Sequence, residues 1–479
     1  MKQSKIADYK NTQKPLWRLT ARERRFIILI GDVLVSVIAL FVALYFWAQQ
    51  DEWLHFSWQF LQERPPDWFY FLPLFWIILL AELYDIRRAS RPRDVVQGIF
   101  FALLISGGVY LLLFFVSSPN PLPRRGVAGF LVAAAILTLL WRMVYIKVFT
   151  APVFLRRVLI VGAGRAGTNL SGIIKGIWPP PYYLVGLVDD DPRKIGKKIN
   201  DLPILGGSGQ LLEIIKREAI SDLIFSISGE MKPEMSKAIL AAEENGVVVN
   251  TMPVVYEELM GRVPIQLLQD DWILRSFLDE SHSSGSYEII KRLMDIFCSV
   301  IGLIITVILF PLISIIILID SGFPVFFIQE RLGKSGKPFL LYKFRTMMQD
   351  AEKDGIARLA VKNDERVTRV GRFLRKSRLD ELPQFFNVLR GDVSMVGPRA
   401  ERPELVDKLQ KKIPFYRARL FVKPGVTGWA QVNYRYATNF EETAVKLEYD
   451  LYYIKNRNIL LDLIIIIRTI GTVLRYIGQ

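Results

Sequence analysis

The sequence predicts a membrane protein that combines apolar helices with α/β domains. Of its 479 residues, 51% are apolar, which is high for a soluble protein and typical of chains with membrane segments. Apolar runs of about the length of a bilayer span fill much of the first 150 residues. After residue 156, short apolar strands alternate with helical segments, which is typical of an α/β fold.

Charge and composition favour some classes of function and exclude others. The net charge of +15 suits a partner such as nucleic acid, anionic lipid or a phosphorylated substrate. The single cysteine, Cys298, excludes a disulfide framework and a cysteine-rich metal site. The only two histidines, His55 and His282, leave little material for histidine-based catalysis, and we interpret both as structural or exposed. The first apolar run is too long for a cleavable signal peptide.

The first part of the chain predicts a basic cytoplasmic tail at 1–25 and a four-helix transmembrane bundle at 26–150. The expected spans lie near 26–48, 69–84, 97–116 and 127–149. The connection at 49–68 is mainly acidic, whereas that at 85–96 carries four arginines. Because positive charge marks the cytoplasmic side, both ends of the bundle should lie inside. No paired charges mark a transport pathway within the spans, so we favour an anchor or scaffold over a transporter.

A Rossmann-like domain is predicted at 151–255. Gly162, Gly164 and Gly167 follow an apolar strand and open a helix, and Asp189 ends the next strand at about the distance of a ribose-binding acid. One interpretation is a nucleotide site formed by these four residues. The other is a scaffold or oligomerisation module with an empty or regulatory pocket, which we favour because the domain has no Tyr-x-x-x-Lys pair. Its remaining elements are expected as helices at 208–218 and 232–245 and strands at 222–227 and 247–251.

The last third of the chain opens with an apolar run from Ile296 to Ile319. A fifth transmembrane helix is the simplest interpretation, but Pro311 breaks or kinks a helix at mid-run. A full crossing would also place the basic region 331–378 outside, against the charge rule. We therefore predict a re-entrant helix that enters one leaflet, bends at Pro311 and returns.

A dense group of charges follows between Lys376 and Arg399. Asp380 and Glu381 are adjacent, arginines precede them, and Arg399 follows a Gly-Pro turn. An arbitrary Asp-Glu pair is most often a solvated feature of a helix N-terminus. Among so many cations, carboxylates suit phosphate chemistry, in which cations hold phosphoryl oxygens and a carboxylate attacks or binds Mg²⁺. The residues alone do not choose between Asp380 and Glu381 as the attacking group.

From Lys291 to its end, the chain resembles the bacterial polyprenyl-phosphate hexose-1-phosphate transferases, which are monotopic phosphoglycosyl transferases. The blocks that carry the resemblance are Lys291-Arg292 with Asp295, Gln329–Gly333, Tyr342–Met347, Leu379–Gln384, Gly397–Arg399 and Lys423–Val432. The resemblance implies that Asp380 attacks the β-phosphate of a UDP-sugar, releases UMP and forms a phosphosugar–aspartyl intermediate, which polyprenyl phosphate then attacks. It implies Mg²⁺ as cofactor, held by Asp380 and Glu381, with Glu381 also a candidate for acid–base assistance.

Further site residues come from the basic region 331–378 and from the later blocks. The basic region could be a solvated or lipid-facing surface, but it could also bind phosphate. We assign Lys343, Arg345 and Arg375 to the phosphates of both substrates, Arg399 to a phosphate or the uridine, and Pro398 and Gln431 to shaping the pocket. Ordinary turn chemistry explains Gln431 about equally well. Relatives usually have proline after the arginine and serine before the bend, where this chain has Ala400 and Phe310.

The resulting fold class is membrane α plus α/β: a four-helix transmembrane bundle, a Rossmann-like domain, and a monotopic catalytic domain with a re-entrant helix and interfacial amphipathic helices such as Ile459–Leu474. The connector is expected at 256–286, with a flexible hinge at Ser281–Ser286, and the catalytic domain at 287–479. The expected partners are a UDP-sugar, polyprenyl phosphate and inner-membrane lipid, without nucleic acid and with a homodimer left open; the catalytic domain should lie on the cytoplasmic face. Two alternatives stay open: a membrane-anchored NAD-dependent nucleotide-sugar epimerase or dehydratase, and a non-catalytic scaffold for polysaccharide assembly.

Overall fold

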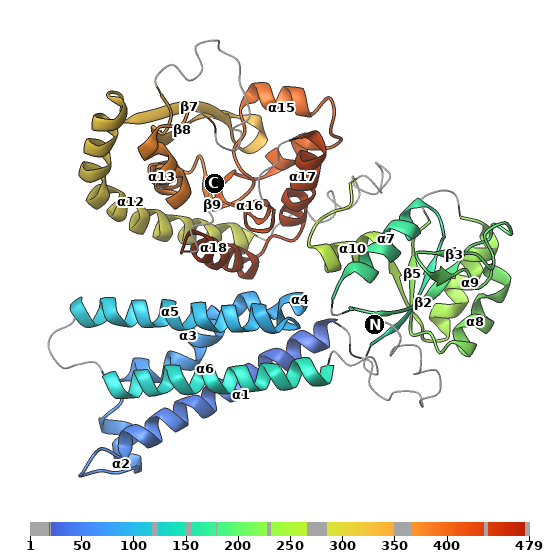
Figure 1. Ribbon diagram of the computed structural model, residues 1–479, viewed down its shortest axis with the longest axis horizontal. Helices are drawn as coiled ribbons and strands as arrows, with labels where there is room; N and C mark the ends of the chain where they lie inside the picture. Colours follow the sequence, from blue (N-terminus) through green and yellow to red (C-terminus); the bar gives the residue numbers. More distant parts are fainter. Residues whose placement is uncertain are drawn as a thin grey trace. The chain divides into compact units, whose positions relative to one another are not determined.

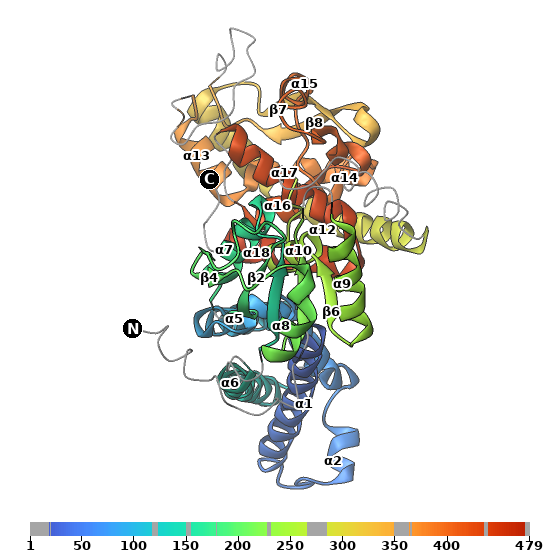
Figure 2. The same cartoon turned by 90° about the vertical axis from the view of Figure 1, so that its right-hand side faces the viewer.

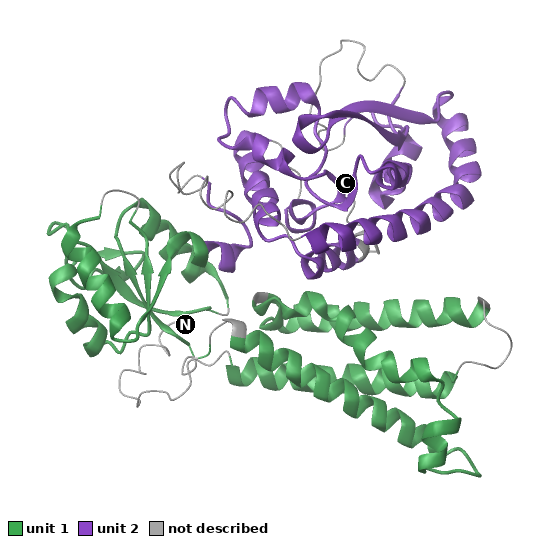
Figure 3. Ribbon diagram, turned by 180° about the vertical axis from the view of Figure 1, so that it is seen from behind, with its two compact units in different colours: residues 1–255 green, residues 256–479 purple. Residues whose placement is uncertain are grey.

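The computed structural model consists of two compact units, residues 1–255 and 256–479 (Figure 3). It describes residues 19, 21–116, 123–149, 155–178, 180–227, 231–265, 285–348, 364, 366–434 and 439–474. Most of the predicted basic tail and most of the predicted hinge lie outside the described residues.

The N-terminal region of the first unit consists of apolar helices. Three are long enough to cross a bilayer: α1 (Ala21–Ala48), α5 (Pro92–Val116) and α6 (Arg124–Phe149). Helices α1 and α6 pack against each other (Figures 1 and 2). The expected span at 69–84 is divided among η2 (Asp67–Phe71), α3 (Leu72–Leu79) and η3 (Ala81–Tyr84), since the backbone of Leu80 leaves the helical region. Two short helices, α2 (Trp58–Glu63) and α4 (Ile86–Ala89), complete the region.

The expectation that the spans contain no paired charges was wrong. A buried ion pair joins α1 and α6. Arg142 Nη2 of α6 donates to Asp32 Oδ2 of α1 at 2.6 Å, and both side chains are fully buried. Arg142 Nη1 also donates to the carbonyl oxygen of Leu83 at 2.9 Å. The two charges lie 110 positions apart in the chain, so no local pattern reveals the pair. Since each charge has a partner, the pair is best explained as a clamp between helices.

The remainder of the first unit is a parallel α/β sheet. Its strands β1 (Arg157–Val161), β2 (Tyr183–Val188), β5 (Asp222–Phe225) and β6 (Val248–Thr251) form the order β2-β1-β5-β6. Apolar residues of α8 (Leu211–Arg217) and α9 (Pro233–Glu244) cover one face, and α7 (Arg165–Gly176) lies on the other (Figure 1). The expected strands and helices are thus confirmed, whereas the hairpin of β3 (Lys198–Ile199) and β4 (Leu202–Pro203) was not anticipated. The short helix η5 (Ser208–Gln210) precedes α8, and α10 (Met252–Met260) begins in the first unit and ends in the second.

The second unit is built around α12 (Gly285–Ser321), a helix of 37 residues that contains Pro311. Figure 1 shows α12 changing direction along its length. Much of its surface is exposed and apolar; Val307 and Ile308, for example, are each 70% exposed. An exposed apolar face of this size marks contact with lipid or with another protein.

Two sheets of two strands each carry several of the motif blocks of this unit. Strands β7 (Phe326–Leu332) and β8 (Pro338–Phe344) form the expected antiparallel hairpin, and β9 (Ser394–Val396) pairs in parallel with β10 (Gly425–Thr427). The helices that follow one another around them are η6 (Lys334–Gly336), α13 (Arg369–Ser377), η7 (Leu379–Glu381), α14 (Gln384–Arg390), α15 (Pro403–Leu409), η8 (Tyr416–Phe421), α16 (Trp429–Asn433), α17 (Phe440–Lys455) and α18 (Ile459–Leu474).

Helix α18 has one polar and one apolar face, as the prediction of an amphipathic helix requires, and its charged residues point toward the protein. Asp462 Oδ2 accepts from Lys291 Nζ at 2.9 Å, and Arg468 Nη1 donates to Asn433 Oδ1 at 2.9 Å. Both charged side chains are buried, whereas Leu460 is exposed. The polar face therefore packs on the protein, because it finds partners there, and the outer face is apolar.

The predicted connector also belongs in part to the second unit. Val263 and Ile265 are buried in its main apolar core. Gly261 supplies the carbonyl oxygen that accepts from Trp429 Nε1 at 2.7 Å. Residues 256–265 therefore form part of the folded unit that carries α16.

Candidate active site

The paired carboxylates lie in η7, a single 3-10 turn between α13 and α14. Arg378 ends α13 in the left-handed conformation, with φ of 61°, so the chain turns sharply just before Asp380 and Glu381. Leu379 and Leu382 flank the pair and pack into an apolar cluster with side chains of α12 and β8. Each carboxylate residue is only 7% exposed. The turn is therefore a rigid, buried platform and not a solvated helix start.

Glu381 is surrounded by cations. Its Oε1 atom accepts from Lys343 Nζ at 3.1 Å and from Arg399 Nη2 at 3.0 Å, and its Oε2 atom lies 3.5 Å from Arg378 Nη1. Burial alone would raise the pKa of Glu381, but these three cations hold it well below its usual range. Burial lowers the pKa of Lys343, which the charge of Glu381 opposes. Glu381 is thus an anion whose oxygens are already committed to the protein.

Asp380 has the opposite environment. Its Oδ1 atom is buried and has no hydrogen-bond partner. Burial, and then the charge of Glu381, raise the pKa of Asp380 well above its ordinary value. A carboxylate oxygen that lacks protein partners and has a raised pKa is suited to bond with an incoming electrophile or cation.

Arg399 reaches this pair from the loop that follows β9. A Cβ atom on Gly397 would collide with the carbonyl oxygen of Lys423, so only glycine fits between the strands. The Gly425 N–H then donates to the carbonyl oxygen of Pro398 at 2.8 Å. Close packing of the two strands therefore helps to place Arg399 opposite Glu381.

The other predicted cations have different surroundings. Arg345 is buried, and its Nη2 atom donates to the hydroxyl of Ser321 at 2.9 Å and to the carbonyl oxygens of Ser321 and Gly322 at the end of α12. Arg375 Nε donates to Thr346 Oγ1 at 2.8 Å, while its charge acts on Asp380. Within the described residues, Arg345 is thus a helix-end contact in this structure, whereas Arg375 lies near the carboxylates.

Gln431 lies on α16, just beyond β10. Its Nε2 atom donates to the carbonyl oxygen of Val426 at 3.2 Å, and its Oε1 atom is buried without a partner. Pro398 contributes its carbonyl oxygen to the strand pairing. Pro398 thus helps to hold the loop that carries Arg399, and Gln431 contacts β10. Substrate contact by either residue stays a prediction.

Two residues of the site were given no individual role from the sequence. Arg378 was counted only as part of a basic run, and its role as the third cation at Glu381 depends on the left-handed turn. Asn387 is fully buried and joins α14 to β8: its Nδ2 atom donates to the carbonyl oxygen of Leu340 at 2.7 Å, and its Oδ1 atom accepts from the Tyr342 N–H at 3.1 Å. We call these two hydrogen bonds the Asn387 seam. They hold β8, which carries Lys343, against α14, the helix that follows the carboxylate turn.

Comparison with known proteins places the site in a family. Residues 286–476 match a family model described as bacterial sugar transferase, and residues 80–253 match one described as CoA-binding domain. A UDP-glucose:undecaprenyl-phosphate glucose-1-phosphate transferase of Escherichia coli is 40% identical over 325 residues, which cover 66% of this chain and 67% of the relative. The chain belongs to the bacterial sugar transferase family. It is therefore a transferase, and its apolar helices make it a membrane protein.

Two further relatives extend the comparison. A UDP-N-acetylgalactosamine-undecaprenyl-phosphate N-acetylgalactosaminephosphotransferase of Aeromonas hydrophila is 42% identical over 252 residues, 53% of this chain and 57% of the relative. A UDP-glucose:undecaprenyl-phosphate glucose-1-phosphate transferase of Xanthomonas campestris is 28% identical over 438 residues, 85% of this chain and 86% of the relative. These names do not favour an epimerase, a dehydratase or a non-catalytic scaffold.

The carboxylate turn of this bacterial sugar transferase offers few side chains that could hold Mg²⁺. No group of three or more His, Cys, Asp or Glu side chains that could hold a metal occurs within the described ranges. Asp380 Oδ1 is an orphaned buried oxygen and fits a cation, whereas Glu381 is already neutralised by its three cations. Mg²⁺ commonly binds through one or two carboxylates plus substrate phosphates and water. The unpartnered oxygen of Asp380 fits that mode, and Mg²⁺ binding by Asp380 and Glu381 stays a prediction.

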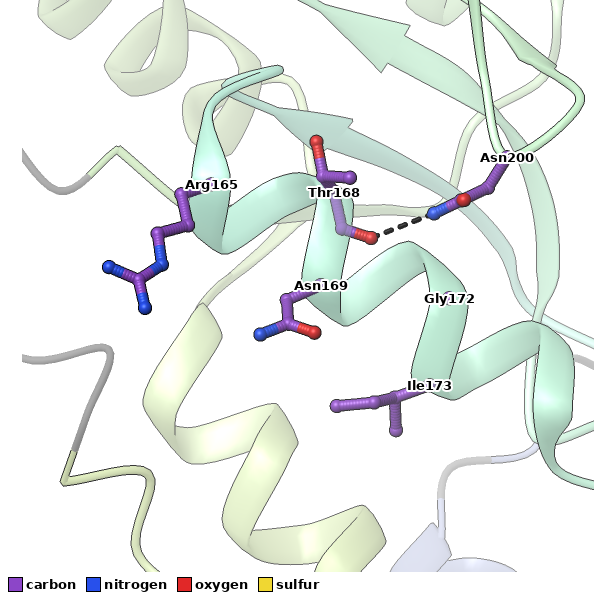
Figure 4. Close-up of a pocket in the computed structure, with 6 residues that line it drawn as sticks. All are labelled: Arg165, Thr168, Asn169, Gly172, Ile173 and Asn200. Carbon is purple, nitrogen blue, oxygen red and sulfur yellow. Dashed lines mark hydrogen bonds between the residues drawn. The ribbon is translucent and has the colours of Figure 1, made fainter. Parts of the chain in front are cut away.

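The glycine loop of the first unit is engaged with its own chain. Asp189 Oδ2 accepts from the Ala163 N–H at 2.8 Å and from Lys194 Nζ at 2.9 Å. A separate pocket of about 540 Å³ lies along one face of α7 (Figure 4). Its lining residues are Arg165, Thr168, Asn169, Gly172, Ile173 and Asn200. Nucleotide binding by Gly162, Gly164, Gly167 and Asp189 stays a prediction, and the contacts of Asp189 agree with the favoured scaffold interpretation.

Proposed function

We propose that this chain transfers a hexose 1-phosphate from a UDP-sugar to polyprenyl phosphate, with release of UMP. The observation that carries the proposal is the contrast within the carboxylate pair: Asp380 has an unpartnered buried oxygen, and Glu381 is held by three cations. The relatives, whose names describe sugar-phosphate transfer to undecaprenyl phosphate, support the same reaction class.

In the first step, an oxygen of Asp380 forms a bond to the β-phosphorus of the UDP-sugar. The bond between that phosphorus and the bridging oxygen breaks, and UMP leaves with the electron pair. In the second step, a phosphate oxygen of polyprenyl phosphate attacks the same phosphorus, and the Asp380 carboxylate is released. Covalent catalysis divides one displacement between two anions into two easier ones.

The surrounding cations fit this division of roles. Lys343 and Arg399 are balanced by Glu381 before substrate binds, so they are fixed in position rather than free to collapse onto Asp380. Fixed cations aimed at the reacting centre stabilise the charge that develops on phosphoryl oxygens, and this is generally a large part of phosphoryl-transfer catalysis. Mg²⁺ bound by Asp380, with Glu381 nearby, would neutralise diphosphate charge.

We further propose that α12 is a re-entrant helix and that the site faces the cytoplasm at the inner membrane. The support is the exposed apolar surface of α12 together with Pro311 inside it, while its buried residues contact the carboxylate turn. Thr306 Oγ1 lies 3.4 Å from the carbonyl oxygen of Leu382, and Phe310 stacks on Phe326 with ring centroids 5.6 Å apart. A site beside a half-buried helix would let a lipid-borne phosphate and a water-soluble nucleotide sugar meet.

The test incubates purified full-length protein with UDP-hexoses, polyprenyl phosphate and Mg²⁺ and measures UMP. Wild type should release UMP with at least one sugar, and Asp380→Asn should lose that activity while melting at a similar temperature. Trapping of a radiolabelled phosphosugar on wild type, but not on Asp380→Asn, would support the covalent intermediate. Turnover by folded Asp380→Asn at the wild-type rate would refute the assignment.

A further inference from the structure

A group of largely buried charged side chains lies next to the main chain at Arg399 and Ala400. It consists of Arg331 on β7, Glu401 after the Arg399 loop, Arg419 on η8, and Lys446 and Asp450 on α17. None of these side chains has a part in the proposed reaction. A buried charge group is costly unless each member has partners, so its presence calls for an explanation.

Arg419 is the centre of this group. Its Nη2 atom donates to Asp450 Oδ2 at 2.9 Å, and its Nη1 atom donates to Tyr416 Oη at 2.6 Å and lies 3.4 Å from Glu401 Oε1. The side chain is only 3% exposed. The same Nη2 atom donates to the main-chain carbonyl oxygen of Arg399 at 3.1 Å. The planar fork of a guanidinium can serve such a divergent set of acceptors, whereas an ammonium cannot.

The neighbouring carbonyl groups are held as well. The carbonyl oxygen of Pro398 accepts from the Gly425 N–H at 2.8 Å, and that of Ala400 accepts from Arg331 Nη1 at 3.1 Å. Three successive carbonyl oxygens, at positions 398, 399 and 400, are thus each fixed by a different element. Ala400 itself does not restrict the backbone as a proline would, so these bonds are what hold the loop.

We propose that Arg419, oriented by Asp450, is a positioning residue that sets the Arg399 guanidinium opposite Glu381. This inference rests on the proposed function, because it assigns Arg399 to the phosphoryl-transfer site. Loss of the Arg419 bond frees one of the three carbonyls and lets the loop relax. A displacement of about 1 Å at a positioned catalytic group commonly costs about 100-fold in rate.

The test is a double-mutant cycle on full-length protein, with UMP release as one readout and UDP affinity by calorimetry as a second. Arg419→Lys keeps the charge but not the fork, and we expect kcat to fall about 10- to 100-fold. In an Arg399→Ala background, the same change should cost less than about threefold, because the group that it positions is gone. Arg417→Lys is the matched control: Arg417 lies on the same η8 helix, is 54% exposed and should leave activity unchanged.

Equal losses in both backgrounds would overturn the proposal, because a general weakening of the fold multiplies with the Arg399 change. Wild-type kcat in folded Arg419→Lys would also overturn it. If Arg419→Lys does not fold, Arg331→Lys tests the same loop through the Ala400 carbonyl, since Arg331 is less buried, and must show the same dependence on Arg399. Wild type that binds UDP but releases no UMP would refute the proposed reaction instead, and the cycle would then be evaluated on UDP affinity alone.

Discussion

Asn387 offers a quantitative test of how the site is held together. Its side chain is fully buried and makes two bonds to the main chain of β8, at 2.7 and 3.1 Å. Asn387→Ala removes both and leaves the Leu340 carbonyl and the Tyr342 N–H without these partners. An unsatisfied buried polar group costs about 1–3 kcal/mol, so we expect a loss of about 2–4 kcal/mol in the free energy of unfolding of the second unit.

The assay is thermal unfolding of the full-length protein in a membrane mimetic, with a parallel measurement of UMP release. For a unit of this size, the expected loss lowers Tm by roughly 5–12 °C. Activity should fall further than stability, because Lys343 directly follows Tyr342 and loses its fixed distance to Glu381. Arg390→Ala is the control: Arg390 lies on the same helix with a largely exposed side chain, and its effect should stay within about 0.5 kcal/mol. A shift as small as the control's would show that the seam does not hold the site.

Three further outcomes are expected. Because burial and Glu381 raise the pKa of Asp380, kcat/KM should fall with decreasing pH at a value above the roughly 3.9 of an ordinary aspartate, and Glu381→Gln should move this limb to lower pH; a profile unchanged by Glu381→Gln would contradict the coupling. Asp32→Ala should destabilise the first unit by about 3–5 kcal/mol in thermal unfolding, since it leaves Arg142 buried and unpaired, and a neutral effect would exclude the clamp. Chelation with EDTA should stop UMP release and added Mg²⁺ should restore it; activity that persists in EDTA would remove Mg²⁺ from the scheme.

Local patterns were sufficient where the relevant residues are close in sequence or lie on one regular element. The strand, glycine turn and helix at Gly162, and the hairpin that carries Lys343, follow directly from alternation and turn residues. Lys343, Glu381 and Arg399 were each predicted from the motif blocks as site residues. Their contacts with one another were not predicted, because no spacing rule links positions so far apart.

The direction in which a side chain points was harder to predict than the element on which it lies. Lys343 and Arg345 are two positions apart, so an extended strand would point both to one face. Strand β8 ends at Phe344, and Arg345 instead turns to the end of α12. The same is true of α18. The helical pattern of the sequence contains Asp462 and Arg468, but it does not show whether these side chains face the protein or water.

The docking of residues 256–265 onto the second unit has a practical consequence for anyone who wishes to express the catalytic part alone. The family match begins at residue 286, but a fragment cut there would lose the acceptor of the Trp429 indole and uncover the apolar site filled by Val263 and Ile265. A fusion protein or a minimal catalytic fragment should therefore start upstream of Tyr256, so that residues 256–265 can pack on the domain that they stabilise.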